Sequence, residues 1–293
     1  MSRTLTYYPP RGLAPITAGY DGDFGLRHAM GLSENLAEVH TVRAPGQHGE
    51  SAVDILSRGR VVRAALTSRS GDDIDQRRRQ LAAALATVPV RRGEVLELGT
   101  LRVERPTPHV VLELPALPHN SPQETLMEGG QAAIFDIEWR CPYPFWMETA
   151  DSFQLLKASG GFQFSVQFPL EMATSNIQVE IDNAGDVDAP VLARLYGDVT
   201  TARIRNLTTG EDLEITGQIL TDQYVEIDTA FGAKKIDLVT ISTGARVSIF
   251  NRLNLAKADF WQLRPGVNVV RFEADTNVSG QATVHWRQRY AGI

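Results

Sequence analysis

The C-terminal half of the chain is a succession of short segments in which apolar and polar residues alternate, and no helical apolar stripe interrupts them. These segments are separated by turns rich in Gly, Pro, Asn and Asp: FQFSVQF, IQVEIDN, PVLARLYG, ARIRNLTTG, EDLEITG, QYVEIDT, KKIDLVTIS, ARVSIFN, NVVRFEA and ATVHWRQRY. Alternation with a period of two residues buries one face of a strand, and strands at this spacing are typical of an antiparallel sandwich. The C-terminal half is therefore expected to be an all-β domain.

The N-terminal half predicts a β-rich domain with one α-helix. Its strand-like runs are GRVVRAALTSR, EVLELGTLRVER, HVVLELPAL and AAIFDIEWRC. The segment SGDDIDQRRRQLAAALATVPV predicts a helix that Asp72 or Asp73 caps and that Pro89 ends. The apolar stripe of this helix consists of Ile74, Leu81, Leu85 and Val88. The run from Arg77 to Arg79 indicates a solvated helix face or a subunit contact rather than a phosphate site.

A boundary between two domains is expected near Met147. With 293 residues, 43% of them hydrophobic, the chain is long enough for two cores. Pro142 and Pro144 hold the chain extended there, and the aromatic residues beside them supply apolar surface that covers the junction. We assign residues 1–147 to an N-terminal domain and residues 148–293 to a C-terminal domain.

The stretch IRNLTTGEDLEI predicts a β-hairpin rather than a site of glycosylation. Ile204 and Leu213 suit an inward face, and Thr208-Thr209-Gly210 supplies a turn in which Gly adopts positive φ. The triplets that begin at Asn206 and Asn277 match the glycan acceptor pattern. Because the N-terminal sequence has no apolar run of the length that a secretory signal needs, we interpret both triplets as turn composition.

Composition argues against several classes of protein. The net charge of −6 and the pI near 5.6 argue against a protein that wraps nucleic acid by neutralising phosphates. Cys141 is the only cysteine, which excludes an intramolecular disulfide and a structural metal site of the Cys/His type. No stretch approaches the roughly 18 apolar residues that a membrane span requires.

The sequence contains no recognisable catalytic or metal-binding motif. Asp182, Asn183, Asp186 and Asp188 fail the EF-hand template, because its third position falls on Ala184 and its twelfth on Ala193. A turn rich in Asp and Asn accounts for this cluster better. The histidines are dispersed without a metal-binding pair, and Cys141 has no signature of a nucleophile. We therefore expect no catalytic residue, no cofactor and no metal.

Four aromatic residues of the predicted sandwich are candidates for stacking on sugars. They are Trp261 and Trp286, which are the principal candidates, with Tyr224 and Tyr290 also available. The alternative interpretation places them in the core, because Trp and Phe in amphipathic strands more often lie there.

Five segments follow one another in the C-terminal half: NAGDVDAPVLARLYGDV, RIRNLTTGEDLEI, YVEIDTAFGAKKI, DFWQLRPGVNVVRFEA and ATVHWRQRYAGI. Their order resembles the distal tail protein family of long-tailed, non-contractile bacteriophages. The residues that carry the resemblance are Asn183, Gly185, Pro190, Asn206, Gly210, Asp228, Phe260, Trp261, Pro265, Gly266 and Asn268. In the N-terminal half the helix RRRQLAAAL and the seam CPYPFW are similar to the family pattern, whereas EVHTVRAPGQHGESAVDIL departs from it.

This resemblance implies a structural virion protein at the distal end of the phage tail, made and assembled in the host cytoplasm. The N-terminal domain is then expected to form a hexameric ring between the tail tube and the tail tip or baseplate. DNA passes only through the lumen of this ring, and the C-terminal domain is a peripheral, galectin-like β-sandwich. The implied partners are other copies of the chain, the tail tube protein, the tape-measure protein, a hub or fibre protein, and receptor-binding proteins.

Two other functions compete with this interpretation. In the first, the C-terminal sandwich is a carbohydrate-binding module that attaches to host cell-wall polysaccharide. In the second, the protein is a cell-wall hydrolase, which requires two facing carboxylates at a set separation. The sequence establishes no such pair, so we expect a protein that is not an enzyme.

Overall fold

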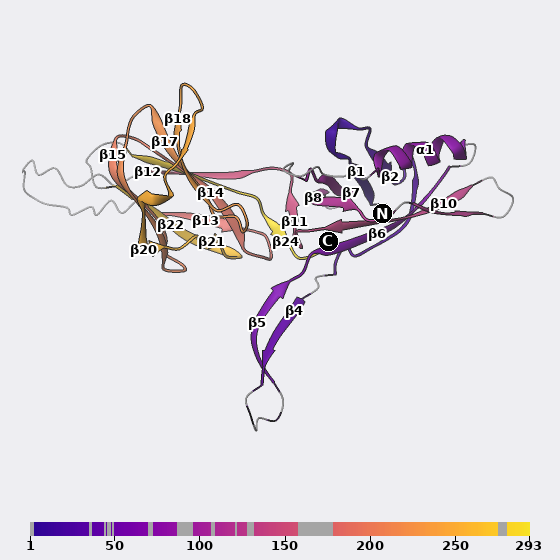
Figure 1. Ribbon diagram of the computed structural model, residues 1–293, viewed down its shortest axis with the longest axis horizontal. Coiled ribbons are helices and arrows are strands. Elements are labelled where there is room, and N and C mark those ends of the chain that lie inside the picture. The colour runs from indigo at the N-terminus through magenta and orange to yellow at the C-terminus, as the bar shows by residue number, and fades with distance from the viewer. Residues whose placement is uncertain are drawn as a thin grey trace, which may run out of the picture. The chain divides into compact units, whose positions relative to one another are not determined.

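The structure is a computed structural model, and it describes residues 3–34, 37–43, 45, 48, 50–69, 73–86, 96–106, 109–120, 122–127, 132–157, 178–274 and 280–293. The chain divides into two compact units (Figure 1). Unit 1 contains Met1–Thr149 and also the last residues, Tyr290–Ile293, and unit 2 contains Ala150–Arg289. Most of the described chain is strand, which confirms the mainly β fold that the alternating pattern predicts.

Unit 1 contains antiparallel strands, one α-helix and one 3-10 turn. Its elements are β1 (Thr4–Tyr8), η1 (Pro10–Gly12), β2 (Ile16–Ala18), β3 (Gly25–Met30), β4 (Ala37–Val42), β5 (Ser51–Ser57), β6 (Arg60–Thr67), α1 (Ile74–Ala84), β7 (Gly99–Pro106), β8 (His109–Pro118), β9 (Gln123–Leu126), β10 (Ala133–Cys141) and β11 (Trp146–Glu148). The main sheet has the order β2-β1-β7-β8-β10-β6-β3, with β9 beside β10 and β11 beside β8. Strands β4 and β5 form a separate two-stranded sheet.

The core of unit 1 lies between the inward faces of this sheet and helix α1. Alternate residues of β10 are buried, and Phe135, Ile137 and Trp139 are at most 2% exposed. The helix contributes Leu81, which is fully buried. Asp73 caps α1, because its side chain accepts hydrogen bonds from the backbone N–H groups of Asp75 and Gln76. This confirms one of the two predicted caps, and Asp72, Val88 and Pro89 lie outside the described residues.

A buried arginine joins separate segments of unit 1. Arg60, at the start of β6, is 3% exposed, and its guanidinium donates hydrogen bonds to backbone carbonyls. The acceptors are the carbonyl oxygens of Gly31, Leu32, Pro144 and Ala291. Trp146 lies beneath the guanidinium, 5.9 Å from it, and donates its indole N–H to the carbonyl of Leu32 at 2.9 Å. Arg60 therefore fastens the C-terminal residues to unit 1.

The described part of unit 2 consists of strands and one 3-10 turn. Its elements are β12 (Ser152–Lys157), β13 (Gln178–Asn183), β14 (Ala189–Tyr196), β15 (Val199–Asn206), β16 (Glu211–Ile219), β17 (Gln223–Asp228), β18 (Lys235–Thr240), β19 (Arg246–Ser248), η2 (Phe250–Arg252), β20 (Leu253–Ala258), β21 (Gln262–Leu263), β22 (Gly266–Ala274) and β23 (Gln281–Trp286). Strand β24 (Arg289–Tyr290) spans the boundary between the units. The segment FQFSVQF lies outside the described residues.

Two antiparallel sheets of unit 2 share one core. The first has the order β12-β23-β14-β17-β18-β19, with β21 beside β14, and the second has the order β13-β22-β15-β16-β20. Inward residues of both sheets belong to one buried cluster, for example Leu195 and Val284 from the first sheet and Ile204 and Phe272 from the second. This packing is that of a β-sandwich, as the sequence predicts.

The predicted hairpin around Gly210 is present. Strands β15 and β16 pair from Val199 to Asn206, and Asn206 lies opposite Glu211. Gly210 closes the turn with φ of +80°, which a residue with a Cβ atom adopts only with strain. Asn206 itself is fully buried, so its side chain has no access to a glycan. Asn277 lies outside the described residues.

A buried carboxylate holds the outer face of the first sheet of unit 2 together. Glu226 in β17 is 2% exposed and accepts hydrogen bonds from Arg194 at 3.0 Å and from Arg246 at 2.5 Å. The ammonium of Lys235 lies 3.4 Å away. Burial alone raises the pKa of Glu226, but the hydrogen bonds from Arg246 and Arg194 outweigh it and lower the pKa to about 2.

We expect Arg60→Met to destabilise unit 1 by about 3 kcal/mol, because it leaves buried carbonyls without donors. Calorimetric melting of the full chain measures the loss. Arg63→Met is the matched control, since Arg63 lies in the same strand but is exposed and pairs only with Glu138 at 2.7 Å. Equal melting temperatures for the two variants would contradict the structural role of Arg60.

We expect Glu226→Gln to lower the free energy of unfolding by about 2 kcal/mol at neutral pH, after allowing for the partial exposure of its partners. Because the pKa of Glu226 is lower in the folded state than its ordinary value of 4.5, its stabilisation is present above that value. The stabilisation is lost as pH falls toward about 2. Urea unfolding of both proteins at about pH 7, 5 and 3 measures this convergence. A difference that does not change with pH would exclude the ion pairs as its cause.

Candidate assembly site

Three buried asparagines from the predicted motifs converge on one short segment of unit 2. Asn183, Asn206 and Asn268 are each fully buried. The side-chain NH₂ of Asn183 donates to the carbonyl of Leu263 at 3.0 Å, and that of Asn206 donates to the carbonyl of Gln262 at 3.4 Å. Asn206 also donates to the side-chain oxygen of Asn268 at 3.3 Å. Motifs that lie up to 85 positions apart therefore meet at strand β21.

Each of these asparagines also fixes its own turn. The side-chain oxygen of Asn183 accepts the N–H of Gly185 at 3.2 Å, and that of Asn206 accepts the N–H of Thr208 at 3.0 Å. Asn268 brackets the Pro265-Gly266 turn, because it both accepts from the N–H of Arg264 at 3.0 Å and donates to the Arg264 carbonyl at 2.7 Å. These residues organise backbone, and none of them is open to a ligand.

The other motif residues hold neighbouring turns or strands. Pro190 lies opposite Gln262 in the pairing of β14 with β21. The carboxylate of Asp228 accepts the N–H of Ala230 at 2.9 Å, and a Cβ atom at Gly185 would lie 2.4 Å from the carbonyl oxygen of Arg289. Phe260 stacks on Phe250, with ring centroids 6.0 Å apart.

The two principal candidates for sugar stacking lie in the core. Trp261 is 1% exposed and Trp286 is 9% exposed, and both belong to the buried cluster of unit 2. Strand alternation explains the position of Trp286, because it follows Ala282 and Val284 on the inward face of β23. Neither ring presents a free face to a sugar. Tyr224 and Tyr290 are both partly exposed.

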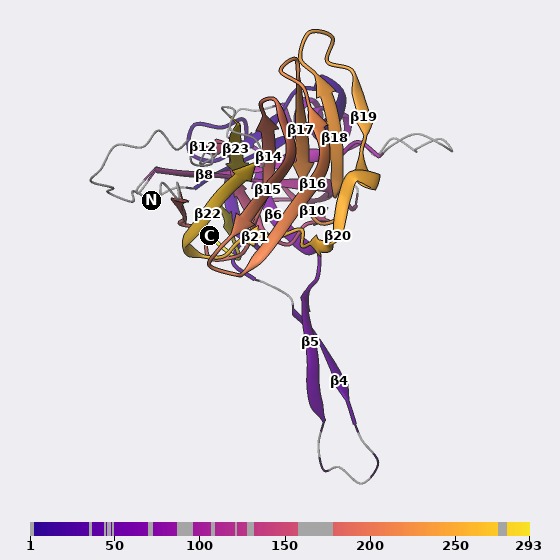
Figure 2. The same cartoon turned by 90° about the vertical axis from the view of Figure 1, so that its left-hand side faces the viewer.

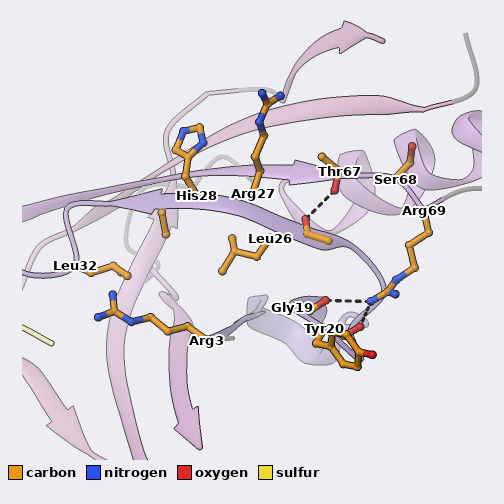
Figure 3. A pocket seen from close by; sticks show the side chains of 12 residues that line it. Arg3, Gly19, Tyr20, Leu26, Arg27, His28, Leu32, Thr67, Ser68 and Arg69 are labelled. Carbon is orange, nitrogen blue, oxygen red and sulfur yellow. Dashed lines mark hydrogen bonds between the residues drawn. The ribbon is translucent and has the colours of Figure 1, made fainter. Parts of the chain in front are cut away.

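Strands β2 and β3 end the main sheet of unit 1. The edge of β2 is bonded to Phe24, because the carbonyl of Thr17 accepts from the N–H of Phe24 at 3.1 Å and the N–H of Gly19 donates to the carbonyl of Phe24 at 2.9 Å. Among the described residues β3 has β6 as its one strand neighbour, so its other edge is open. Arg69 holds the connecting loop, since its guanidinium donates to the carbonyls of Gly19 at 3.0 Å and Tyr20 (Figure 3). It also donates to the carbonyl of Gly22 at 3.0 Å. Open edges carry backbone donors and acceptors that pair readily with another chain.

Positive charge gathers along the β3 edge. The register of β3 against β6 shifts between Leu26 and His28, which places Arg27 in a bulge. Figure 3 shows Arg27 and His28 extending to the same side of the strand, and the same pocket is lined by Arg3. No local sequence pattern predicts this pocket, because its residues come from separate segments of the chain.

Strands β4 and β5 pair with each other and are exposed, and we call these two strands the arm (residues 37–42 and 51–57, with the described residue Glu50 before β5; Figure 2). Every residue of β5 is exposed, including Val53 at 65% and Ile55 at 64%. Val39 lies opposite Ile55 and is 52% exposed. A two-stranded hairpin is at best marginally stable in water, and apolar side chains on it favour a covering partner.

The described residues offer little for catalysis or metal binding. Cys141 is 1% exposed, and burial raises the pKa of its thiol to about 12, so the thiol stays protonated at neutral pH. No group of three or more His, Cys, Asp or Glu residues in the described ranges is placed to hold a metal ion. Within the same ranges, no helix has the length and apolarity to span a membrane.

Comparisons with known proteins agree with the fold. Residues 184–290 match the family model of the siphovirus-type tail component, C-terminal domain. The SPP1 Dit protein, described as a paradigm of the hub adsorption apparatus in phages that infect Gram-positive bacteria, is 14% identical. The match covers 97% of this chain and 98% of SPP1 Dit, with a TM-score of 0.62.

Two chains from the phage P2 baseplate in its activated conformation, one with calcium and one with strontium, are 10% identical, with TM-scores of 0.48 and 0.47. These matches cover 100% and 97% of this chain, and the same shares of the baseplate chains. No curated protein matches the sequence. Residues 184–290 are thus similar to the C-terminal domain of the siphovirus-type tail component, and the chain as a whole shares the fold of SPP1 Dit.

Proposed function

We propose that this protein is a structural component of the distal end of a siphovirus tail, in which six copies form a ring between the tail tube and the hub. The observation that carries the proposal is the match to SPP1 Dit over 97% of this chain, together with the tail-component domain at residues 184–290. In this proposal residues 1–147 build the ring, together with the last residues, 290–293, which belong to unit 1. The rest of residues 148–293 forms a peripheral, galectin-like adaptor domain.

The open edge of β3 supports ring formation. A ring of identical copies needs two different surfaces that meet head to tail, and in this proposal the β3 edge is one of them. Pairing between copies also satisfies backbone groups that an isolated copy leaves to water. In this proposal the β3 edge therefore forms part of the contact between neighbouring copies.

The arm supports a second contact between copies. Its apolar pair, Val39 and Ile55, is exposed and supplies surface to bury. Asp54 and Glu50 give the arm acidic groups, whereas the β3 edge carries Arg27. Opposite charges of this kind fix the register of an interface more than they add to its affinity.

The proposed position implies several partners. They are the tail tube protein, the tape-measure protein, a hub or fibre protein, and receptor-binding proteins attached below. DNA crosses the lumen without being bound, which suits the net charge of −6. The proposed location is the virion, after assembly in the host cytoplasm, and this role requires no catalytic centre.

Ring formation predicts a mass near six times 32.3 kDa for the purified protein. We expect Ile55→Asp to abolish this assembly, because it places a charge on the apolar surface of the arm. Leu255→Asp is the matched control, since Leu255 is 79% exposed on unit 2. Light scattering behind size exclusion, across a concentration series and with or without the tail tube protein, measures the mass.

A wild-type protein that stays monomeric in both conditions would contradict the ring. A hexamer formed equally well by the Ile55→Asp variant would contradict only the contribution of the arm.

A further inference from the structure

The open edge of β3 has different chemistry on its two sides. Among the described residues β6 is the one strand that pairs with β3, so a second strand can still be added. Leu26 and Ala29 lie opposite Leu66 and Ala64 of β6 and pack against the core of unit 1. His28 lies on the other side of the strand and is exposed. An added strand therefore meets apolar groups on one side of β3 and polar groups on the other.

The bulge in β3 adds a cation to the polar side. The register against β6 shifts between Leu26 and His28, which leaves Arg27 outside the ladder, and Figure 3 shows Arg27 and His28 extending to the same side. Both residues line a pocket of about 730 Å³ together with Arg3 and Arg69, and none of the described lining residues is acidic. No described carboxylate pairs with Arg27. This edge therefore favours a partner that brings an acidic side chain.

Strand β5 of the arm carries the complementary pattern. In the described structure it pairs only with β4, and all seven of its residues are exposed. Val53 and Ile55 alternate with Asp54 along the strand, and they are 65% and 64% exposed. The carboxylate of Asp54 accepts the N–H of Ile55 at 2.8 Å, and no described cation pairs with it. An acidic residue between two apolar residues is the pattern that the β3 edge accepts.

We propose that β5 of one copy adds to the open edge of β3 in the next copy, antiparallel and with Asp54 beside Arg27 and His28. This inference rests on the proposed ring and names the two surfaces that meet in it. Strand addition gains affinity from backbone hydrogen bonds and specificity from side chains at alternate positions. Because β3 and β5 are different surfaces, the contact is head to tail, which is the type that closes a ring.

The antiparallel register satisfies both sides of β3 at once. With Asp54 opposite His28, Val53 lies opposite Ala29 on the apolar side, and Ala52 lies opposite Met30 on the polar side. The contact covers apolar residues of a two-stranded sheet that is at best marginally stable alone. Every copy carries both surfaces, and within one described chain they do not pair with each other. A second copy is therefore the occupant that fits this edge.

Disulfide trapping tests the register directly. In the double variant Met30→Cys with Ala52→Cys, the two thiols face each other across the contact, so oxidation is expected to join copies into covalent oligomers of up to six chains. Each single variant is a matched control, because it supplies only one half of the pair. Cys141 is 1% exposed and does not compete. Denaturing electrophoresis before and after reduction measures the products.

Charge exchange tests the chemistry of the contact. Asp54→Arg and Arg27→Asp each bring like charges together, and each is expected to raise the concentration needed for half-assembly by roughly tenfold. The variant with both substitutions restores opposite charges and is expected to lie within about threefold of wild type. Asp182→Arg is the control, because Asp182 is an exposed acidic residue of β13 in unit 2. Light scattering across a concentration series measures assembly.

The outcomes separate this contact from the ring itself. A wild-type hexamer whose double cysteine variant gives no covalent oligomer beyond a dimer would overturn the contact and leave the ring standing. The same holds if the disulfide forms within one copy, or if neither charge reversal weakens assembly. A wild-type protein that stays monomeric with and without the tail tube protein would overturn the ring and the contact together.

Discussion

Buried side chains that supply hydrogen-bond donors to backbone carbonyls are the constraint on which both units depend. Several buried carbonyls without donors together cost a free energy comparable to the net stability of a domain. In unit 1 the guanidinium of Arg60 supplies such donors, and in unit 2 the amides of Asn183, Asn206 and Asn268 supply them. Turns, and the short strand β21 between them, can therefore be buried with their carbonyls bonded to side chains.

Much of the regular structure could be predicted because strand alternation is a local property. The hairpin from Ile204 to Ile215 has inward residues at every second position and a glycine where the turn needs positive φ. The cap of α1 was predictable for the same reason, since Asp73 acts only on the residues that follow it. Local rules identify such elements without knowledge of their neighbours in space.

The remaining features depend on contacts between distant segments. The arm includes Val53 and Ile55. Their alternation with polar residues predicts that they lie on a buried face, but both are exposed and no described residue covers them. The burial of Trp261 follows from packing between two sheets, which local sequence does not fix. The same holds for the attachment of Ala291 to Arg60, because the two residues are 231 positions apart.

The division between buried motif residues and exposed surface residues also separates fold from function. Asn206 and Asn268, two of the residues that carry the family resemblance, are fully buried, and they hydrogen-bond to backbone and to each other. These turns are required whatever the sandwich binds, because the sheets form only when the turns between their strands close. Exposed residues such as Asp54 and Ile55 of the arm lie outside these networks, so substitutions there change the surface without removing a buried donor. Contacts with partners can therefore vary independently of the hydrogen bonds that maintain the fold.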